Sequence, residues 1–239
     1  MKVSAIIPAA GSGERFGEEK QFKLLAGRPL LFHTLKPFLQ SDAIDEVIIV
    51  VPRNDVAAIH RDAVSMSAGK SVKVVTGGAR RQDSVKNGVD ASDSDSTLIC
   101  IHDAVRPFVT KDLIQNSISA CENAEGAVVA LPSKDTVKYV EDGLVKETID
   151  REKIWLAQTP QTFHKEKLIQ ALDSAFSENL IGTDESTLME AMGFSVTLVK
   201  GNETNFKITT MDDWERAEAV AFRRNRQAHQ RQAQGTIKE

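Results

Sequence analysis

The chain has 239 residues, of which 41% are hydrophobic and 27% are charged, proportions that are ordinary for a globular protein with one sizeable domain. Its formal net charge of −4 argues against a nucleic-acid-binding protein, because affinity for a phosphate backbone needs a surplus of lysine and arginine. Cys100 and Cys121 lack the C-x-x-C spacing of a zinc site, and neither a signal peptide nor an apolar run of roughly 18 residues is present, so we expect a cytoplasmic protein without a membrane partner.

The first half of the chain alternates short apolar runs with segments of helical periodicity. We expect strands over residues 3–8, 47–51, 72–75, 97–101 and 127–131. Between them we expect helices over residues 29–39, 54–67, 82–90 and 110–122. Strands that are apolar on both faces are typical of a mostly parallel sheet with helices on each side, and ligands of such sheets bind at the carboxyl ends of the strands.

Residues 136–140 and 144–149 break this alternation, because two extended runs meet at Asp142-Gly143, a strong hairpin signal. A two-stranded hairpin is marginally stable alone in water, so we expect it to pack on a second copy of the chain. The alternative is that the hairpin folds back as an antiparallel edge of its own sheet.

The last third of the chain predicts more α/β structure. Helices are expected over residues 165–176 and 183–192 and from about residue 212, a strand over 195–199, and an extended piece over 205–208. From Arg223 the chain becomes polar, and we expect this end to fray. We therefore predict one domain over residues 1–226, including a β-arm at about 134–150, and a polar tail over 227–239.

A glycine-rich loop follows the first strand and is the first candidate binding site. Gly11, Gly13 and Gly17 allow backbone N–H groups to approach an anion, while Arg15 and Lys20 supply positive charge. The plainer alternative is a tight strand-to-helix turn with two solvated cations. A dinucleotide-binding G-x-G-x-x-G motif is not completed, since position 16 is Phe, and the G-x-x-x-x-G-K-[ST] pattern of a P-loop is not present.

A second glycine turn, Gly77-Gly78, is followed by Arg80, Arg81 and Ser84 at the start of a helix. Cations at a helix N-terminus oppose the helix dipole, so we expect an anion nearby.

The strand over 97–101 leads into His102, Asp103 and Arg106. Asp103 suits a ribose hydroxyl or Mg²⁺, and Arg106 suits a phosphate, while a buried Asp–Arg pair is the alternative. We interpret His102 as structural. With Arg151 and Lys207, four strand-end positions carry cations, as two phosphate-bearing substrates would need.

Taken together, these motifs resemble the 2-C-methyl-D-erythritol 4-phosphate cytidylyltransferase family. The resemblance covers residues 3 to about 217 in the order of the family. The matching segments are Ala9 to Arg15 with Lys20-Gln21, Gly77 to Ser84, His102 to Pro107, Asp135-Thr136, Asp150-Arg151, Thr159 to Gln161, Thr183 to Glu185 and Lys207 to Thr209.

The resemblance implies a single Rossmann-like nucleotidyltransferase domain that transfers a cytidylyl group from CTP to 2-C-methyl-D-erythritol 4-phosphate, with Mg²⁺ or another divalent cation as cofactor. It implies that the protein is a homodimer formed through the β-arm. It assigns catalysis to Arg15, Lys20 and Lys207, and CTP binding to Ala9, Ala10, Gly11, Gly13, Gly78, Ser84 and Asp103. It assigns the sugar-alcohol phosphate to Arg106, Thr136, Arg151 and Thr159, with Asp103 and Lys207 beside them, and it leaves the protein ligands of the metal unknown.

Two alternatives share the nucleotide-side motifs. The first is a ribitol 5-phosphate cytidylyltransferase, which differs only in the alcohol. The second is a non-catalytic nucleotide-binding regulator of the same fold, which would have little need for the full set of charged residues.

Overall fold

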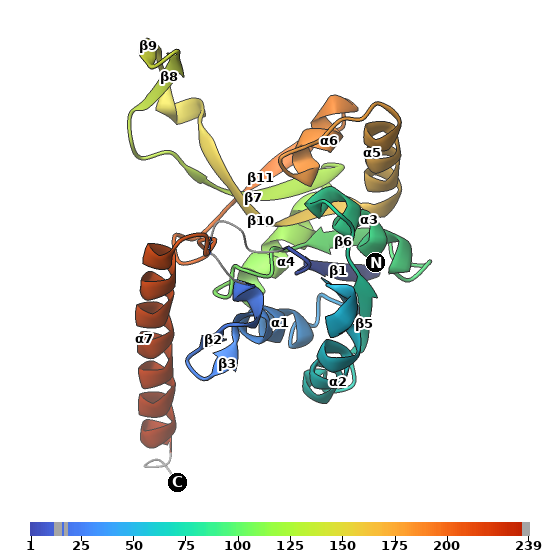
Figure 1. The fold of residues 1–239 in the computed structure, drawn as a ribbon, viewed down its shortest axis with the longest axis vertical. Coiled ribbons are helices and arrows are strands. Elements are labelled where there is room, and N and C mark those ends of the chain that lie inside the picture. The colour runs from blue at the N-terminus through green and yellow to red at the C-terminus, as the bar shows by residue number, and fades with distance from the viewer. Residues whose placement is uncertain (12–15, 17–18, 236–239) are drawn as a thin grey trace.

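The computed structural model describes residues 1–11, 16 and 19–235, which fold around a seven-stranded sheet (Figure 1). The strands lie in the order β11 (Val196–Lys200), β7 (Gly126–Pro132), β10 (Trp155–His164), β6 (Leu98–Ile101), β1 (Val3–Pro8), β4 (Glu46–Val51) and β5 (Ser71–Thr76). All neighbouring pairs are parallel except those of β10, which runs antiparallel to both β6 and β7. The predicted α/β class with a mostly parallel sheet is confirmed.

Helices cover both faces of the sheet, which explains why its strands are apolar throughout. One face packs against α1 (Leu30–Leu39), α2 (Val56–Met66) and α4 (Lys111–Ser119), and the other against α3 (Arg81–Ala91), α5 (Lys165–Ser177) and α6 (Glu185–Ala191). Side chains alternate between faces along a strand, so Ile7 of β1 belongs to the first core and Ile6 to the second. Both are fully buried.

Strand β10 was not predicted from the sequence. It contains Pro160 and several polar residues, which argue against a central strand. Its register against β7 shifts between Ala157 and Gln161, and the Thr159–Pro160 peptide is cis, so the proline lies where the regular ladder is interrupted. Gln161, just after this proline, pairs with Ile101, so the interrupted part of β10 lies beside the carboxyl end of β6, while the strand itself ends at His164, opposite Leu98.

The predicted hairpin forms a separate two-stranded sheet of β8 (Val137–Glu141) and β9 (Leu144–Ile149), the β-arm, which projects from the body in Figure 1. Asp142 and Gly143 have φ values of 51° and 77°, the left-handed conformation that a tight type I′ hairpin turn requires. The alternative of an extra edge strand on the central sheet is therefore wrong. That the β-arm packs against a second copy of the chain stays a prediction.

The remaining elements are small, apart from the last helix. They are the short strands β2 (Leu24–Leu25) and β3 (Arg28–Pro29) and the 3-10 helices Lys20–Phe22, Arg53–Asp55, Ala120–Glu122 and Arg151–Lys153. Helix α7 (Met211–Gly235) is continuous past Arg223, where fraying was expected, and extends away from the body (Figure 1). The expected extended piece over 205–208 forms no strand. Within the described part of the chain, no helix combines the length and apolar character needed to cross a membrane.

Candidate active site

A cavity of about 430 Å³ opens at the carboxyl ends of β1 and β6, where a parallel sheet is expected to bind its ligand. This size suits a small-molecule ligand. We call it the strand-end pocket. It is lined by Pro8, Ala9, Ala10, Gly11, Lys20, Gln21, Gly78, Ala79, Arg80, Arg81, Ser84, Asp103, Ala104, Val105 and Lys207.

The pocket brings together eight of the residues predicted from the sequence. They come from four segments that are far apart in the chain: Ala9, Ala10, Gly11, Lys20, Gly78, Ser84, Asp103 and Lys207. These residues therefore line one cavity although they stand far apart in the sequence, and their roles in binding and catalysis stay predictions.

The turn at Gly78 is held closed by a serine hydroxyl. The Gly78 N–H donates to Ser84 Oγ at 3.1 Å, and the same hydroxyl donates to the Arg80 carbonyl at 3.1 Å. A Cβ on Gly78 would lie 2.4 Å from the Cβ of Asp83, so only glycine fits here without moving the helix. Ser84 thus lines the pocket while its hydroxyl also holds the turn.

The two arginines at the start of α3 are neutralised by protein carboxylates. Arg80 pairs with Asp83 of the same turn at 2.7 Å. Arg81 donates from Nη1 to both oxygens of Glu185 at 2.7 and 2.9 Å, and from Nε to Asp103 Oδ1 at 3.2 Å. The anion expected near this helix end is therefore supplied, in this structure, by the protein itself. Burial alone would lower the pKa of Arg81, but the two carboxylates outweigh burial and raise it.

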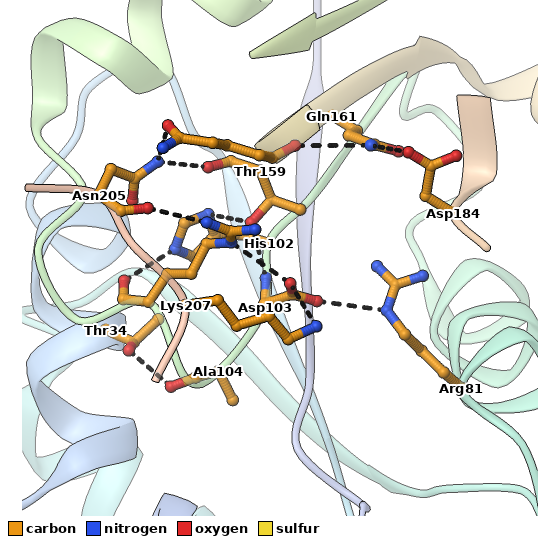
Figure 2. A network of polar contacts seen from close by, with 12 residues as sticks. Thr34, Arg81, His102, Asp103, Ala104, Thr159, Gln161, Asp184, Asn205 and Lys207 are labelled. Atoms are coloured by element: carbon orange, nitrogen blue, oxygen red, sulfur yellow. Dashed lines mark hydrogen bonds and ion pairs between the residues drawn. The ribbon is translucent and has the colours of Figure 1, made fainter. Parts of the chain in front are cut away.

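Asp103 is the centre of a cluster of three cations (Figure 2). Besides Arg81 at Oδ1, its Oδ2 contacts Lys207 Nζ at 3.0 Å and Arg106 Nε at 3.4 Å. Burial would raise the pKa of Asp103, but the three cations outweigh it and hold the pKa well below its usual range. Asp103 is therefore ionised and holds all three cations, of which Arg81 and Lys207 line the pocket.

A buried polar layer supports Asp103 from behind. Thr159 Oγ1 accepts from the Asp103 backbone N–H at 3.1 Å and contacts His102 Nδ1 at 2.9 Å, while His102 Nε2 lies 3.1 Å from the Arg106 carbonyl (Figure 2). Asn205 Nδ2 donates to the Thr159 carbonyl at 2.7 Å. Burial lowers the pKa of His102 to about 4, so His102 is neutral near pH 7 and structural, as expected.

Arg106 and Thr159 were predicted to contact the sugar-alcohol phosphate, but neither side chain lines the pocket. Arg106 is 8% exposed, and its Nη1 donates to the Asn205 carbonyl at 2.9 Å. Thr159 is 4% exposed. In this structure both residues hold Asp103 and the 205–208 segment in place, so the buried Asp–Arg pair weighed as the alternative is present.

Lys20 lies on the pocket wall in the 3-10 helix Lys20–Phe22. Its ammonium is 5.5 Å from the centre of the Phe16 ring, and Phe16 packs at 5.9 Å against Trp214 of α7. Gln21, which was not assigned a role, donates from Nε2 to the Gly11 carbonyl at 3.1 Å and ties the two ends of the glycine-rich loop. Gly13 and Arg15, both predicted to bind the triphosphate, lie outside the described residues.

Thr136 and Arg151 lie at the base of the β-arm and do not line the strand-end pocket of their own chain. Both residues are exposed, and Arg151 Nη1 donates to the Lys134 carbonyl at 3.0 Å. A role for them at a binding site therefore depends on a second copy of the chain.

The side chains around the pocket that could coordinate a metal indicate how a divalent cation could be held. Over residues 1–11, 16 and 19–235, no three His, Cys, Asp or Glu side chains gather into a group that could hold a metal ion. Asp103 is the carboxylate on the pocket wall, and three cations already contact it. This arrangement fits Mg²⁺ carried mainly by the phosphates of a ligand, which is how proteins commonly bind it.

Comparison with known proteins connects this geometry with a reaction. The family model of 2-C-methyl-D-erythritol 4-phosphate cytidylyltransferase matches residues 3–223. The enzyme of that name from Syntrophus aciditrophicus is 43% identical over 91% of this chain and 95% of its own, and the one from Halalkalibacterium halodurans is 42% identical over 95% of this chain and 100% of its own. The solved structure of 4-diphosphocytidyl-2C-methyl-D-erythritol synthase from Anaerococcus prevotii superposes with a TM-score of 0.82 at 33% identity, covering 92% of this chain and 97% of its own.

Proposed function

Because the chain belongs to the 2-C-methyl-D-erythritol 4-phosphate cytidylyltransferase family, we propose that its strand-end pocket is where CTP and the sugar-alcohol phosphate react. The reaction is the transfer of a cytidylyl group from CTP to 2-C-methyl-D-erythritol 4-phosphate in isoprenoid biosynthesis, with pyrophosphate as the second product. The observation that carries the proposal is the Asp103 cluster, which holds Arg81 and Lys207 on the wall of a pocket that Gly11 and Gly78 also line.

We place the nucleotide along the two turns. Cytosine and ribose would lie against Ala9, Ala10, Gly78 and Ser84, with Asp103 within reach of a ribose hydroxyl. The triphosphate would extend past Gly11 toward Lys20, and Arg15 and Gly13 are proposed to complete that part of the site. The small side chains here support the placement, because they let a ligand approach the backbone N–H groups.

The sugar-alcohol phosphate is proposed to lie at Lys207, beside Asp103. A phosphate monoester has a second pKa near ~6, so at pH 7 it is mostly a dianion and already nucleophilic. No general base is needed. One of its oxygens forms the bond to the α-phosphorus of CTP, and the bond to the β-phosphate breaks, with its electron pair leaving on pyrophosphate.

The protein's task is therefore positioning and charge stabilisation. Lys20 and Lys207, with Arg15, are proposed to stabilise the negative charge that grows at the α-phosphorus and on the leaving group. When bound, Mg²⁺ would supply further charge neutralisation at the phosphates, held mainly by their oxygens and by Asp103 if that carboxylate exchanges a cation for the metal.

A homodimer formed through the β-arm completes the proposal. Tyr139, Val140, Leu144 and Val145 of the arm are each about half exposed or more, at 48%, 49%, 65% and 61%. Exposed apolar side chains gathered on one small element are typical of an interface. We propose that Thr136 and Arg151 reach the sugar-alcohol phosphate in the partner's pocket. A cytoplasmic location fits Cys100 and Cys121, which are both free and buried.

Pyrophosphate release with CTP and Mg²⁺ tests the function. We expect turnover with 2-C-methyl-D-erythritol 4-phosphate and none with ribitol 5-phosphate at the same concentration. Activity with ribitol 5-phosphate alone would reassign the alcohol. CTP binding without product from either alcohol would favour a non-catalytic regulator.

A further inference from the structure

Glu185 is a buried carboxylate that reaches the strand-end pocket only through another residue. It is 1% exposed and does not line the pocket, whereas its partner Arg81 does. Both Glu185 oxygens accept from Arg81 Nη1, and Arg81 Nε donates to Asp103 Oδ1. The three side chains therefore form one line from the start of α6 to the centre of the cation cluster.

The position of Glu185 is fixed by the cap of its own helix. Asp184 Oδ1 accepts from the Thr187 backbone N–H at 3.1 Å and from Ser186 Oγ at 3.0 Å, which caps α6. Asp184 Oδ2 accepts from Gln161 Nε2 at 2.7 Å, so the cap is also tied to β10 (Figure 2). Glu185 is thus held rigidly relative to the sheet that carries Asp103.

The charges explain why this rigidity matters. Among the residues that the structure describes, Arg81, Arg106 and Lys207 pair with two carboxylates, Asp103 and Glu185. A guanidinium prefers to engage both oxygens of a carboxylate. Without Glu185, Arg81 would turn toward both oxygens of Asp103 and compete with Lys207, whose Nζ is 3.0 Å from Oδ2.

We propose that Glu185 is a positioning residue that holds Arg81 on one oxygen of Asp103 and so leaves the other oxygen to orient Lys207 toward the sugar-alcohol phosphate. The inference rests on the proposed function, which places that phosphate at Lys207. It assigns to Glu185, in the first turn of α6, a role beyond helix capping.

The test is steady-state kinetics of the full chain with CTP, 2-C-methyl-D-erythritol 4-phosphate and Mg²⁺. In Glu185→Gln, we expect the KM for the sugar-alcohol phosphate to rise about 10-fold, the scale on which a displaced positioning contact acts. The KM for CTP should stay within about twofold, because Glu185 does not touch the nucleotide wall. Partial unfolding would lower kcat without moving either KM, so this split separates positioning from a purely structural role.

A double-mutant cycle with Arg81 makes the test specific. If Glu185 acts through Arg81, its substitution should have no further effect on KM when Arg81→Gln is already present. Glu190→Gln is the matched control, since it removes an exposed carboxylate from the same helix, and it should match the wild type. If Glu185→Gln does not fold, Glu185→Asp keeps the charge but withdraws it by one methylene, and the KM should rise about threefold.

The outcomes separate the inference from the proposed function. An unchanged KM in both Glu185 variants, or an equal penalty with and without Arg81, overturns the inference alone, provided that Lys207→Ala is impaired. A wild-type protein that makes no product, or a Lys207→Ala variant with wild-type kinetics, overturns the proposed function and this inference with it.

Discussion

His102 is a buried, neutral histidine whose protonation opposes folding. Its pKa is lowered by burial from 6.5 to about 4. Between these values the unfolded chain binds more protons than the folded one, so the free energy of unfolding falls as the pH drops from 6.5 to 4. Full titration corresponds to roughly 3 kcal/mol.

Urea unfolding at pH 6.5 and pH 4.5 measures this loss. His102→Gln keeps a donor and an acceptor but cannot be protonated, so we expect a smaller loss over the same pH interval. Because the two proteins share all their carboxylates, the titration of those groups cancels in the comparison. Equal losses in the two proteins would exclude His102 as the cause.

Lys20 lines the part of the pocket where the triphosphate is proposed to lie. We expect Lys20→Ala to lower kcat by about 10²-fold or more, the scale of losing one preorganised electrostatic donor. Lys36→Ala, which removes an exposed lysine on α1, should leave kcat near normal. Near-normal turnover of Lys20→Ala would remove Lys20 from the mechanism.

At the residue scale, the sequence indicated the residues that line the pocket better than the buried residues that hold them in place. Gly78 and Asp103, which were singled out because they follow predicted strands, and Lys207, which lies in a predicted extended piece, all line the pocket. Charge alone could not show that Arg106 lies behind the wall, because a cation that binds a ligand and one that holds a carboxylate have the same sequence signal. The partnership of Arg81 and Glu185 was missed, since it joins residues 104 positions apart.

At the element scale, helix α3 approaches β1 closely at a glycine. A Cβ on Gly88 would lie 2.5 Å from Ile6 Cγ2 and 3.2 Å from Val50 Cγ2. Alanine gains about 1 kcal/mol of helix propensity, but overpacking a core costs about 1–3 kcal/mol, and β-branched neighbours yield little. We expect Gly88→Ala to destabilise the protein by about 1–2 kcal/mol in urea unfolding.

The complementary change tests the cause. Ile6→Ala makes room for the new methyl group, so the double variant should be less destabilised than the two single changes added together. A stabilised Gly88→Ala, or strict additivity, would mean that α3 moves away at little cost.

The elements that were predicted are those whose pattern is local. Apolar runs located β1, β4 and β7, and Asp142-Gly143 located the β-arm. Strand β10 carries polar residues that are buried by partners elsewhere, such as Gln161, whose Nε2 bonds Asp184. Its place in the sheet depends on these distant contacts and on an interrupted register. Neither can be recognised from a local stretch of the sequence.

At the scale of the whole molecule, the β-arm governs the expected assembly. Leu144 is 65% exposed, so Leu144→Asp leaves the fold of one subunit intact but places a charge in the proposed interface. We expect sedimentation to show a dimer for the wild type and a monomer for Leu144→Asp. Val64→Asp, at an exposed position on α2 far from the arm, is the control and should stay dimeric. A monomeric wild type would remove the dimer from the proposal.

Mixing two inactive variants tests whether the arm completes the partner's site. Lys207→Ala damages the pocket, and Arg151→Ala damages the arm. A mixed dimer contains one site with neither change, so an equilibrated mixture should regain about one quarter of the wild-type activity. No recovery after subunit exchange would confine each site to one chain.

The chain's two tryptophans give its two working regions separate optical signals. Trp214 is 3% exposed and packs against Phe16 and near Lys23, whose ammonium lies 5.2 Å from its ring, next to the glycine-rich loop. Trp155 is 37% exposed at the start of β10, near the base of the β-arm. Replacing either one by phenylalanine leaves a single tryptophan, which can be excited selectively over Tyr139, so nucleotide binding and subunit association can be followed independently in unlabelled protein.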